Sequence, residues 1–415
     1  MGLKKAVILG YDAISPLGSD LESQWQKALD GESGIGPLSR FATGDDFPVH
    51  IAGQVPDIDD EPYPFLSARH QASWSSPVFK YSMLSVTRAL CRSKIEITPD
   101  LSPRVAVTYS SAIGGVDAVL KADRRLMAEN KLPHPYTNPN ACINMVGGKI
   151  AIQTKARGPI TSTITACATG LSSMVIGAMF LAQGRADVAI CGAVDFALVE
   201  PIVAGFATMN GCYNPQKGQE NEAPDKASRP FSKNRRGFVL SEGAGAVILA
   251  TKEFAQAHGL EYAIELAGWG MTSDAHHFVA PYFETVRQCM ADAIHDAGIT
   301  RQDIDAVNAH AASTRVGDKV EYDALLDLFD GALPPISANK SLIGHAMGAS
   351  SVIESIFAMH GMQHDWLLPT INYTPDPEMV LDCVSEGKRQ LTQEFVLKNA
   401  FGFGGCNCCA VFRRV

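Results

Sequence analysis

The sequence has no excess of basic residues, and this lack argues against a protein that binds nucleic acid through a broad charged face. Its 415 residues include 35 Lys and Arg against 44 Asp and Glu, a net charge of −9, so a phosphate backbone would be repelled. A long apolar run is also missing at the start of the chain. The short run there ends at Tyr11 and Asp12, too early for a signal segment or a membrane span. We therefore expect a cytoplasmic protein that binds neither nucleic acid nor a membrane.

Motifs for nucleotide cofactors and for metals are missing as well. The glycine-rich stretches 268–270 and 402–405 do not complete a G-x-G-x-x-G pattern, and no Walker A pattern is present. Three of the ten cysteines crowd together at Cys406, Cys408 and Cys409, where a metal or redox cluster is the alternative to simple packing. Their spacing lacks the paired C-x-x-C of a zinc site, and no nearby histidine completes four ligands. We expect no cofactor and no metal, and we expect these cysteines to pack within the last strand.

What the sequence does contain is a regular alternation of short apolar strands and longer helices. Strand-like runs such as Val105 to Thr108 and Ala306 to Asn308 alternate with helical stretches such as Val78 to Cys91 and Tyr282 to Ala297. This order predicts an α/β fold in which parallel strands are joined by crossover helices. One series of elements ends near residue 255 and a second follows without a linker. We therefore predict two similar halves, residues 1–255 and 256–415.

Cys167 is the strongest local signal for chemistry. The β-rich run from Ile160 to Thr165 turns directly into an apolar helix, and Cys167 lies at the turn. The free N–H groups and the positive dipole end of a helix N-terminus stabilise a thiolate, so the sulfur is a candidate nucleophile. The alternative is a buried structural cysteine. Because the helix is apolar on nearly all its faces, it must lie at the centre of the fold and would hold a nucleophile rigidly.

Two histidines lie at junctions of the same kind. His310 follows a short strand-like run, and His345 comes five residues after Lys340, before an apolar helix that contains Glu354. Open α/β sheets bind ligands beyond the carboxyl ends of their strands, so we expect these groups to converge with Cys167. A thiolate can accept an acyl group, and two imidazoles can donate hydrogen bonds to an enolate oxygen, which suits chemistry on a thioester. Either histidine alone would more often be structural.

A fourth segment, residues 399–407, joins the end of one strand to the start of the last one. It is rich in glycine, which lets backbone N–H groups approach a ligand closely. The functional interpretation is an oxyanion hole, and the alternative is a plain glycine-rich hairpin.

Together these four segments resemble the motifs of the elongating β-ketoacyl-[acyl carrier protein] synthases of the thiolase-like superfamily, and the resemblance spans essentially the whole chain. The resemblance implies a five-layered α/β/α/β/α fold made of two similar halves, and a homodimer. Further stretches share it, namely Ser15 to Gly18, Gly31 to Gly36, Asn144 and Met145, Ser228 to Phe231, Gly237 to Leu240, and Ser273 to Ala275.

The resemblance implies a role for each of the reactive side chains. Cys167 would accept the acyl group, while His310 and His345 would assist decarboxylation and stabilise the enolate. Lys340 and Glu354 match the charged residues that support this pair in the family.

The resemblance also implies substrate contacts. Backbone N–H groups of Cys167 and Phe403 would form the oxyanion hole, and Phe403 matches the family's gating phenylalanine. Ile113 and Phe206 match positions that line the acyl pocket. Three more residues match the substrate path: Ser313, Thr314 and His277. For His277 a solvated loop is the alternative.

Two positions depart from the family pattern. The usual His-Gly-Thr-Ser-Thr has Ala312 in place of its first threonine, and Cys406 replaces the threonine of Gly-Gly-Thr-Asn. One hydroxyl that would hold the phosphopantetheine arm of the carrier is therefore missing.

The reaction that the resemblance implies is a decarboxylative Claisen condensation. An acyl group moves from an acyl carrier protein to Cys167, and malonyl-[acyl carrier protein] loses carbon dioxide and attacks it to give a 3-oxoacyl-[acyl carrier protein]. The pathway would be fatty acid biosynthesis or a specialised polyketide or polyene pathway. The alternative is a noncatalytic subunit of the chain-length-factor kind, in a heterodimer with another ketosynthase. Such subunits typically lack the cysteine, so Cys167 favours an active enzyme.

Overall fold

Five strands of the first half lie side by side in the computed structural model, which describes residues 6–58, 63, 65, 67–209, 211–214 and 222–415. They are β1 (Ala6–Ile14), β4 (Val105–Ser110), β5 (Ile160–Thr161), β6 (Val188–Asp195) and β7 (Gly243–Thr251). Their order across the sheet is β1-β7-β6-β4-β5. β4 is parallel to β5 and β6, whereas β7 is antiparallel to its neighbours β1 and β6.

The second half repeats this topology. Its strands are β8 (Ile264–Ser273), β9 (Ala306–Asn308), β10 (Ile336–Ser337), β13 (Phe395–Gly402) and β14 (Cys406–Arg414). Their order is β8-β14-β13-β9-β10, with β9 parallel to β10 and β13, and β14 antiparallel to β8 and β13. In both halves the first strand lies beside the last, and β1 pairs with β8 to join the halves. The two halves therefore share one strand order and one pattern of strand directions.

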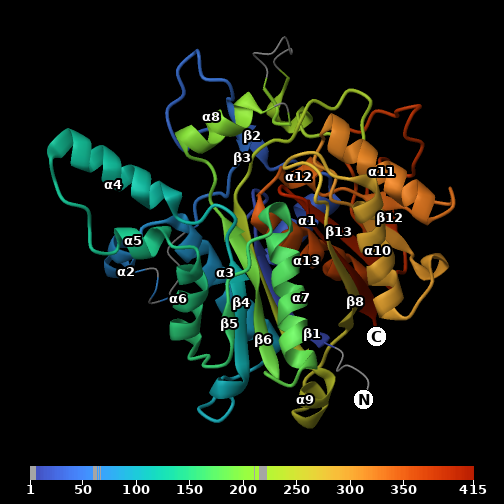
Figure 1. The fold of residues 1–415 in the computed structure, drawn as a ribbon, viewed down its shortest axis with the longest axis horizontal. Coiled ribbons are helices and arrows are strands. Elements are labelled where there is room, and N and C mark those ends of the chain that lie inside the picture. Colours follow the sequence, from blue (N-terminus) through green and yellow to red (C-terminus); the bar gives the residue numbers. More distant parts are fainter. Residues whose placement is uncertain (1–5, 59–62, 64, 66, 210, 215–221) are drawn as a thin grey trace.

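The ten strands form one sheet, and helices cover the outer face of each half of it and fill the space between the two halves. The outer helices are α3 (Pro77–Ser93) and α6 (Asn144–Thr154) on the first half, and α10 (Phe283–Ala297) and α11 (Arg315–Leu328) on the second, while α7 (Thr169–Ala182) and α13 (Gly348–His364) lie between (Figure 1). One apolar core joins α3 and α6 to the strands of the first half, and another joins α10 and α11 to those of the second. A third core contains α7, α13 and strands of both halves. The predicted five-layered α/β/α/β/α fold is confirmed.

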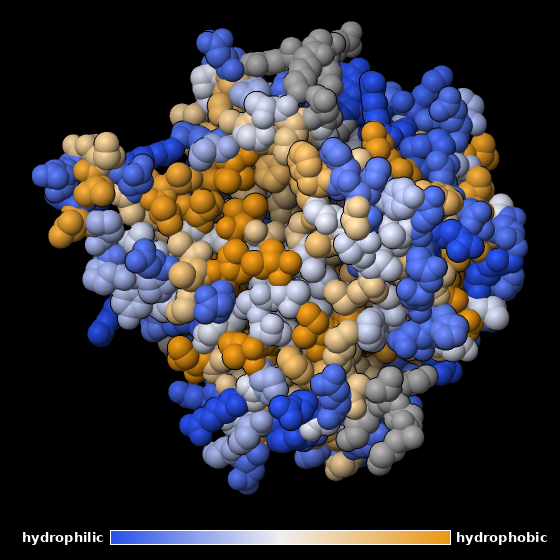
Figure 2. All heavy atoms as spheres, viewed as in Figure 1, coloured by the Kyte–Doolittle hydropathy of each residue, from blue (hydrophilic) through white to orange (hydrophobic). Residues whose placement is uncertain are grey.

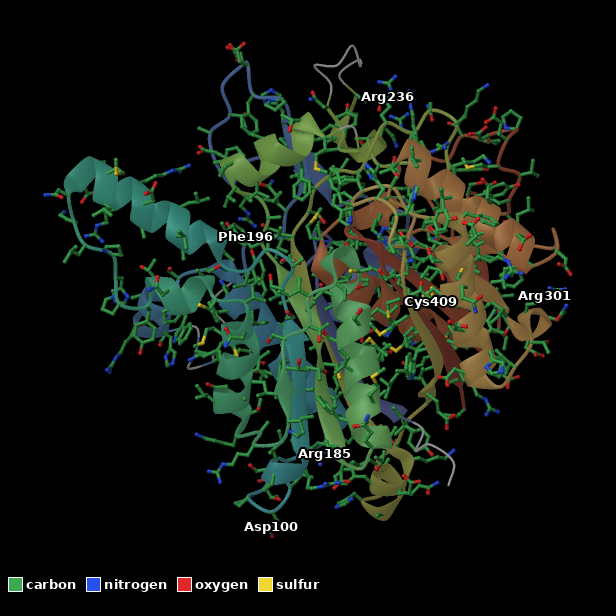
Figure 3. The ribbon with its side chains drawn as sticks, in the orientation of Figure 1. Asp100, Arg185, Phe196, Arg236, Arg301 and Cys409 are labelled. Carbon is green, nitrogen blue, oxygen red and sulfur yellow. The ribbon has the colours of Figure 1, made fainter. Side chains whose placement is uncertain are left out.

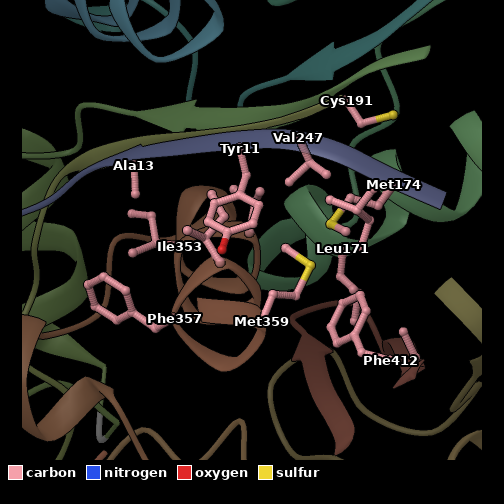
Figure 4. Close-up of a cluster of buried hydrophobic side chains, with 14 of the residues drawn as sticks. Tyr11, Ala13, Leu171, Met174, Cys191, Val247, Ile353, Phe357, Met359 and Phe412 are labelled. Carbon is pink, nitrogen blue, oxygen red and sulfur yellow. The ribbon is translucent and has the colours of Figure 1, made fainter. Parts of the chain in front are cut away.

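The central layer forms because α7 and α13 are apolar on nearly all their faces. Leu171 on α7 and Phe357 on α13 are fully buried in this layer, where Tyr11 of β1 also packs (Figure 4). The two helices approach closely at Gly170, where a Cβ atom would lie 2.7 Å from the Cβ of Val352. A side chain there would force the helices apart, so the start of α7 is fixed against α13.

Further elements surround this framework. The additional helices are α1 (Leu21–Leu29), α2 (Ala68–Ser73), α4 (Val116–Glu129), α5 (Thr137–Ala141), α8 (Glu200–Thr208), α9 (Lys252–Ala257) and α12 (Lys340–Ile343). Two small sheets pair β2 (Ile35–Pro37) with β3 (Ile51–Gly53), and β11 (Trp366–Leu367) with β12 (Arg389–Gln390). Helix α4 projects from the body at the left of Figure 1. Within the described part of the chain, no helix is long and apolar enough to cross a membrane.

The structure corrects two details of the predicted fold. The sheet is mixed rather than parallel, because β13 and β14 are joined by three residues, 403–405, too few for a crossover helix. The β-rich run before Cys167 forms a strand only at Ile160–Thr161. The boundary after residue 255 stays a prediction; it falls within α9, between β7 and β8.

Candidate active site

A cavity of about 490 Å³ opens between the two halves. It is lined by the turn at Cys167, the end of α8, the loop after β8, the segment between β9 and α11, the turn before α13, and the β13–β14 hairpin. Several of these segments follow the carboxyl ends of strands, where α/β folds commonly bind ligands. The predicted convergence of Cys167, His310 and His345 is observed, since all three line this cavity.

Cys167 is held in a tight turn against the β13–β14 hairpin. It lies in a 3₁₀ turn, Ala166–Ala168, directly before α7. Ala166 has a φ of +47°, in the left-handed region that residues other than glycine seldom adopt. On the hairpin side, a Cβ on Gly402 would lie 2.2 Å from the carbonyl oxygen of Thr165. Glycine at position 402 therefore lets the hairpin contact the turn, and the cysteine has little freedom to move.

Burial makes Cys167 a thiol in the resting site. It raises the pKa of the Cys167 thiol to about 11, and Lys340 and the backbone N–H of Phe403 only partly offset the rise. The helix N-terminus and the nearby positive groups favour a thiolate, as expected from the sequence, but desolvation outweighs them. A base must remove the proton during reaction, and Nε2 of His345 lies 3.1 Å from the sulfur.

His345 is held between Cys167 and Ser350. Its Nδ1 atom lies 2.9 Å from Oγ of Ser350. A hydroxyl can donate or accept a hydrogen bond, so Ser350 supports a ring that carries its proton on either nitrogen. Burial, together with the charges of Lys340 and Lys398, holds the pKa of His345 well below its usual range. The ring is therefore neutral at pH 7 and can accept a proton from the thiol.

The contacts of His310 fix which of its ring nitrogens carries the proton. Nζ of Lys340 lies 2.5 Å from the carbonyl oxygen of His310 and 3.5 Å from its Nδ1. Because an ammonium group only donates, Nδ1 accepts and the ring proton is left on Nε2. Burial, Lys340 and His345 hold the pKa of His310 well below its usual range. The two imidazole centroids are 5.7 Å apart, so His310 can donate to a group that His345 also reaches.

A buried network of charges supports Lys340. The two oxygens of Glu354 each contact one ammonium group, Nζ of Lys340 at 2.7 Å and Nζ of Lys398 at 2.6 Å. All three side chains are buried. Lys340 and Glu354 are predicted here from the sequence, whereas Lys398 is not. The available signal was a lysine inside the apolar strand 395–402, because a lysine buried in a sheet needs a partner of opposite charge.

Two backbone donors approach the sulfur of the nucleophile, one of them from the hairpin. The N–H groups of Phe403 and of Cys167 itself donate toward the Cys167 sulfur. Gly404 and Gly405 have φ values of +82° and +71°, which shape the turn after Phe403. The segment is thus a glycine-rich hairpin that brings the N–H of Phe403 to the sulfur, and the oxyanion hole stays a prediction.

Two aromatic rings that the sequence analysis did not single out stand beside the histidines. The Phe238 ring centroid is 5.5 Å from that of His345, and the Phe401 centroid is 5.7 Å from that of His310. Both phenylalanines line the cavity with Phe403. They exclude water from the imidazoles, which contributes to the lowered histidine pKa values.

The predicted acyl-pocket residues lie one layer behind these rings. Ile113, Phe206 and Phe403 pack against one apolar cluster that contains Phe238. The Phe206 and Phe238 centroids are 5.8 Å apart. Of these four residues, Phe403 and Phe238 line the cavity, whereas Ile113 and Phe206 do not and pack against the cluster instead.

The predicted substrate-path residues divide into two groups. Thr314 and His277 line the cavity, and the His277 ring stacks on Phe278 at the exposed mouth. Ser313 does not line it. Its Oγ accepts the backbone N–H of Arg229 at 3.1 Å, and the side chain is buried. Ser313 therefore joins two backbone segments, and its hydroxyl does not reach the cavity.

Asp195 is a buried residue that no sequence motif indicated. Its carboxylate accepts hydrogen bonds from Oγ of Ser111 at 2.5 Å, from the N–H of Ile113 at 2.9 Å and from the N–H of Gly348 at 2.7 Å. Burial raises its pKa to about 6. These bonds connect the segment after β4 to the first residue of α13, and so fix Ile113 relative to the turn that carries His345.

The three clustered cysteines lie on β14. Cys408 and Cys409 are buried and Cys406 is half-buried. Figure 3 shows Cys409 in the interior of the second half. The expectation that these residues pack within the last strand is confirmed.

Known proteins match this chain over its full length. Residues 4–255 match the family model of the β-ketoacyl synthase N-terminal domain, and residues 263–374 match that of the C-terminal domain. The chain is 35% identical over 422 residues to 3-oxoacyl-[acyl-carrier-protein] synthase 2 of Coxiella burnetii, with 100% of both proteins covered.

Solved structures give the same assignment. The ishigamide ketosynthase/chain length factor superimposes with a TM-score of 0.90 at 27% identity, over 100% of both chains. A type II PKS ketosynthase, in complex with its acyl-carrier protein and bound to the hexaketide, shares the fold with a TM-score of 0.89 at 24% identity, over 100% of both chains. With a cysteine and two histidines converging in one cavity and both family domains matched, this chain belongs to the β-ketoacyl synthase family.

Proposed function

We propose that this protein transfers an acyl group from an acyl carrier protein to Cys167 and extends it by decarboxylative condensation with malonyl-[acyl carrier protein]. The observation that carries this proposal is the 3.1 Å contact between Sγ of Cys167 and Nε2 of His345, in a cavity that His310 also lines. A nucleophile, a base within reach and a second imidazole that donates are the groups that the two half-reactions need.

The first half-reaction is acyl transfer. The Cys167 sulfur attacks the thioester carbonyl as its proton moves to Nε2 of His345, whose other nitrogen then donates to Ser350. The carbonyl oxygen becomes an oxyanion that the N–H groups of Cys167 and Phe403 stabilise. Collapse breaks the bond to the carrier sulfur, which takes the proton from His345. The acyl group is left on Cys167, and both imidazoles are neutral again.

The second half-reaction begins with loss of carbon dioxide. The bond between the malonyl carboxylate and the adjacent carbon breaks, and its electron pair forms an enolate on the thioester oxygen. Nε2–H groups of His310 and His345 donate to that oxygen. For His345 this requires its proton on Nε2, which the Ser350 hydroxyl allows by donating to Nδ1. The histidines thus differ, because His345 accepts and donates whereas His310 only donates.

Condensation completes the cycle. The enolate carbon attacks the acyl carbonyl on Cys167, and the backbone donors again stabilise the oxyanion. Collapse forms the 3-oxoacyl-carrier thioester and releases the Cys167 thiolate. Because the thiol's pKa is raised by burial, the thiolate takes a proton from solvent and the resting site is restored.

The proposed partner is an acyl carrier protein. The Coxiella burnetii relative is named for an acyl-carrier-protein substrate, and the type II PKS ketosynthase of the same fold holds its own carrier. The mouth of the cavity presents Phe278, which is 69% exposed, beside Val316 and Arg315. A phosphopantetheine arm enters between these residues to reach Cys167.

We also propose that the active form is a homodimer. Strand β5 lies at the end of the sheet order, and an uncovered edge strand favours pairing with another chain. Ile152, Ile160 and Ile164 are exposed on and around this edge. Figure 2 shows apolar side chains gathered on the same face of the molecule. A second copy of this chain would cover them.

Sedimentation of the wild type and of Ile160→Asp tests the dimer. A wild-type dimer that dissociates in the variant supports it. A wild type that sediments as a monomer and assembles only with another ketosynthase-like subunit would establish the heterodimer instead.

The function itself is tested with purified protein, an acyl-carrier protein and malonyl-carrier protein labelled in its free carboxyl group. Release of labelled carbon dioxide together with a 3-oxoacyl-carrier product, detected by mass spectrometry, supports a condensing enzyme. A protein that yields neither alone, but changes the product length of a partner ketosynthase, would be the noncatalytic subunit.

A further inference from the structure

Lys398 is a buried charged residue that none of the steps above uses. Its side chain on β13 is 0% exposed. The ammonium group lies 2.6 Å from Oε2 of Glu354 and 2.9 Å from the carbonyl oxygen of Asn399. Oε1 of Glu354 contacts Lys340 at 2.7 Å, and Lys340 contacts His310. One carboxylate is therefore shared by two ammonium groups next to an imidazole of the site.

This arrangement holds more positive charge than the carboxylate needs. Lys340 alone would neutralise Glu354, and burying a second ammonium group is costly. The neighbouring acid, Glu321, already accepts the backbone N–H groups of His310 and Ala311 at 2.9 and 2.8 Å. The group formed by Lys340, Glu354 and Lys398 thus has a net charge of +1, and it lies on the side of His310 opposite the ring nitrogen that carries the proton.

We propose that Lys398 is a positioning residue of the condensing site, which fixes Glu354 and Lys340 behind His310 and supplies a positive charge that stabilises the enolate. This inference rests on the proposed function. Lys398 does not line the cavity, so it acts through Glu354 and Lys340 and through its field. A charge fixed in a water-poor interior acts more strongly on a developing negative charge than the same charge in solvent.

The same positive charge keeps both imidazoles neutral. Lys398 lowers the pKa of His310 and of His345, beside the larger effects of burial and of Lys340. Without Lys398 both pKa values rise, so His345 becomes protonated at a higher pH and no longer accepts the Cys167 proton. The titratable groups that face Lys398 are Glu354 on α13, Lys340 on α12, Glu321 on α11, Cys408 on β14, and the two histidines.

Lys398→Gln removes the positive charge but keeps a hydrogen-bond donor, because the amide can still donate to Glu354. Two rates are measured: carbon dioxide release from malonyl-carrier protein, and acylation of Cys167 between pH 5 and 9. We expect carbon dioxide release to fall about tenfold, the equivalent of one pKa unit of lost stabilisation. We expect the acid limb of acylation to move up by about half a unit to one unit, with the rate at pH 8 retained.

Lys252→Met is the matched control, since Lys252 pairs with the buried Glu265 at 3.0 Å far from the cavity. It should change neither rate. Lys398→Gln with wild-type carbon dioxide release and an unmoved acid limb would overturn the proposal. If both Lys398→Gln and Lys398→Met fail to melt cooperatively, Lys398 is a core-stabilising residue and the proposal is also overturned.

Titration of the histidines by NMR distinguishes this proposal from the proposed function. Resonances of His310 and His345 are identified by their loss in His310→Asn and His345→Asn. If the histidine pKa values rise in Lys398→Gln, the electrostatic role of Lys398 is supported. A wild type that releases no carbon dioxide would contradict only the condensing function and would leave this NMR result standing. Unchanged titrations would contradict the role of Lys398.

Discussion

The Nε2 atom of His345 lies 3.1 Å from the Sγ atom of Cys167. Burial raises the pKa of the thiol to about 11 and, with two nearby lysines, lowers that of the imidazole. Both shifts favour the uncharged pair over thiolate and imidazolium. The resting site is therefore a thiol poised beside a neutral base, and the charge separates only as the sulfur attacks.

This pairing predicts the pH dependence of alkylation. The thiolate fraction of Cys167 rises about tenfold per pH unit below its pKa, so its reaction with iodoacetamide should keep accelerating from pH 7 to pH 10. Cys91 and Cys142 are exposed and also react, so the Cys167→Ala rate is subtracted. A plateau at neutral pH would instead reveal a preformed ion pair.

The two histidines should separate the half-reactions. His310→Ala should leave Cys167 acylation close to wild type but slow malonyl decarboxylation about 100- to 1000-fold, the usual effect of removing one oxyanion donor. His345→Ala should slow both steps, because its Nε2 also contacts the thiol. Acylation and carbon dioxide release are measured separately, with His295→Ala, at an exposed position on α10 that does not line the cavity, as the control. Equal loss of both steps in His310→Ala would contradict the assignment.

Most of the reactive residues could be predicted from the sequence because they lie at strand ends. His310 and His345 follow parallel strands of the second half, whose carboxyl ends lie at one edge. Cys167 follows a strand of the first half, and the cavity lies where the two halves meet. Side-chain direction could not be predicted. Phe238 and Phe401 lie in segments that the sequence singles out, but nothing in the order of residues shows which rings face the cavity.

The environment of the nucleophile was also beyond the sequence. A helix N-terminus favours a thiolate, yet Cys167 is enclosed by segments of both halves, and the resulting desolvation reverses the effect. Strand direction was missed for a related reason: β7 is buried on both faces, and such a strand has the same apolar pattern whether it runs parallel or antiparallel.

Ile113 should limit the length of the acyl chain. It packs with Phe206 and Phe403 behind the cavity wall, so Ile113→Phe fills the space into which a chain extends. We expect shorter accepted chains and an overpacking cost of about 1–3 kcal/mol. Acylation with a series of acyl-carrier substrates measures this, with the exposed Val380→Phe as control. An unchanged chain-length profile would place the acyl pocket elsewhere.

Asp12 should make the fold less stable as pH rises. It is fully buried in β1, and neither carboxylate oxygen has a hydrogen-bond partner among the described residues, although Arg92 lies 3.5 Å away. Burial raises its pKa from 3.8 to about 8. The folded state therefore keeps the proton while the unfolded state loses it above pH 4. Each pH unit between 4 and 8 then costs up to about 1.4 kcal/mol, and the loss ends above pH 8.

Asp12→Asn tests this by removing the ionisable group. The difference in unfolding free energy between variant and wild type should grow from pH 5 to pH 8, as measured by urea unfolding at each pH. Asp123→Asn, at an exposed position on α4, is the control. A difference that stays constant with pH would show that Asp12 is ionised in the folded protein.

The acyl-enzyme intermediate is the central claim, and the mass of the intact protein tests it most directly. Wild type and Cys167→Ala are incubated with an acyl-carrier protein. The mass of one portion is measured intact and after digestion, and a second, undigested portion is treated with malonyl-carrier protein before its mass is measured. We expect the wild type to gain the mass of one acyl group, located on the peptide that contains Cys167. Addition of malonyl-carrier protein should remove this mass as a 3-oxoacyl-carrier product appears. Cys167→Ala should melt like the wild type and gain no mass. An acyl group found on another residue, or a condensation product formed by Cys167→Ala, would contradict the account.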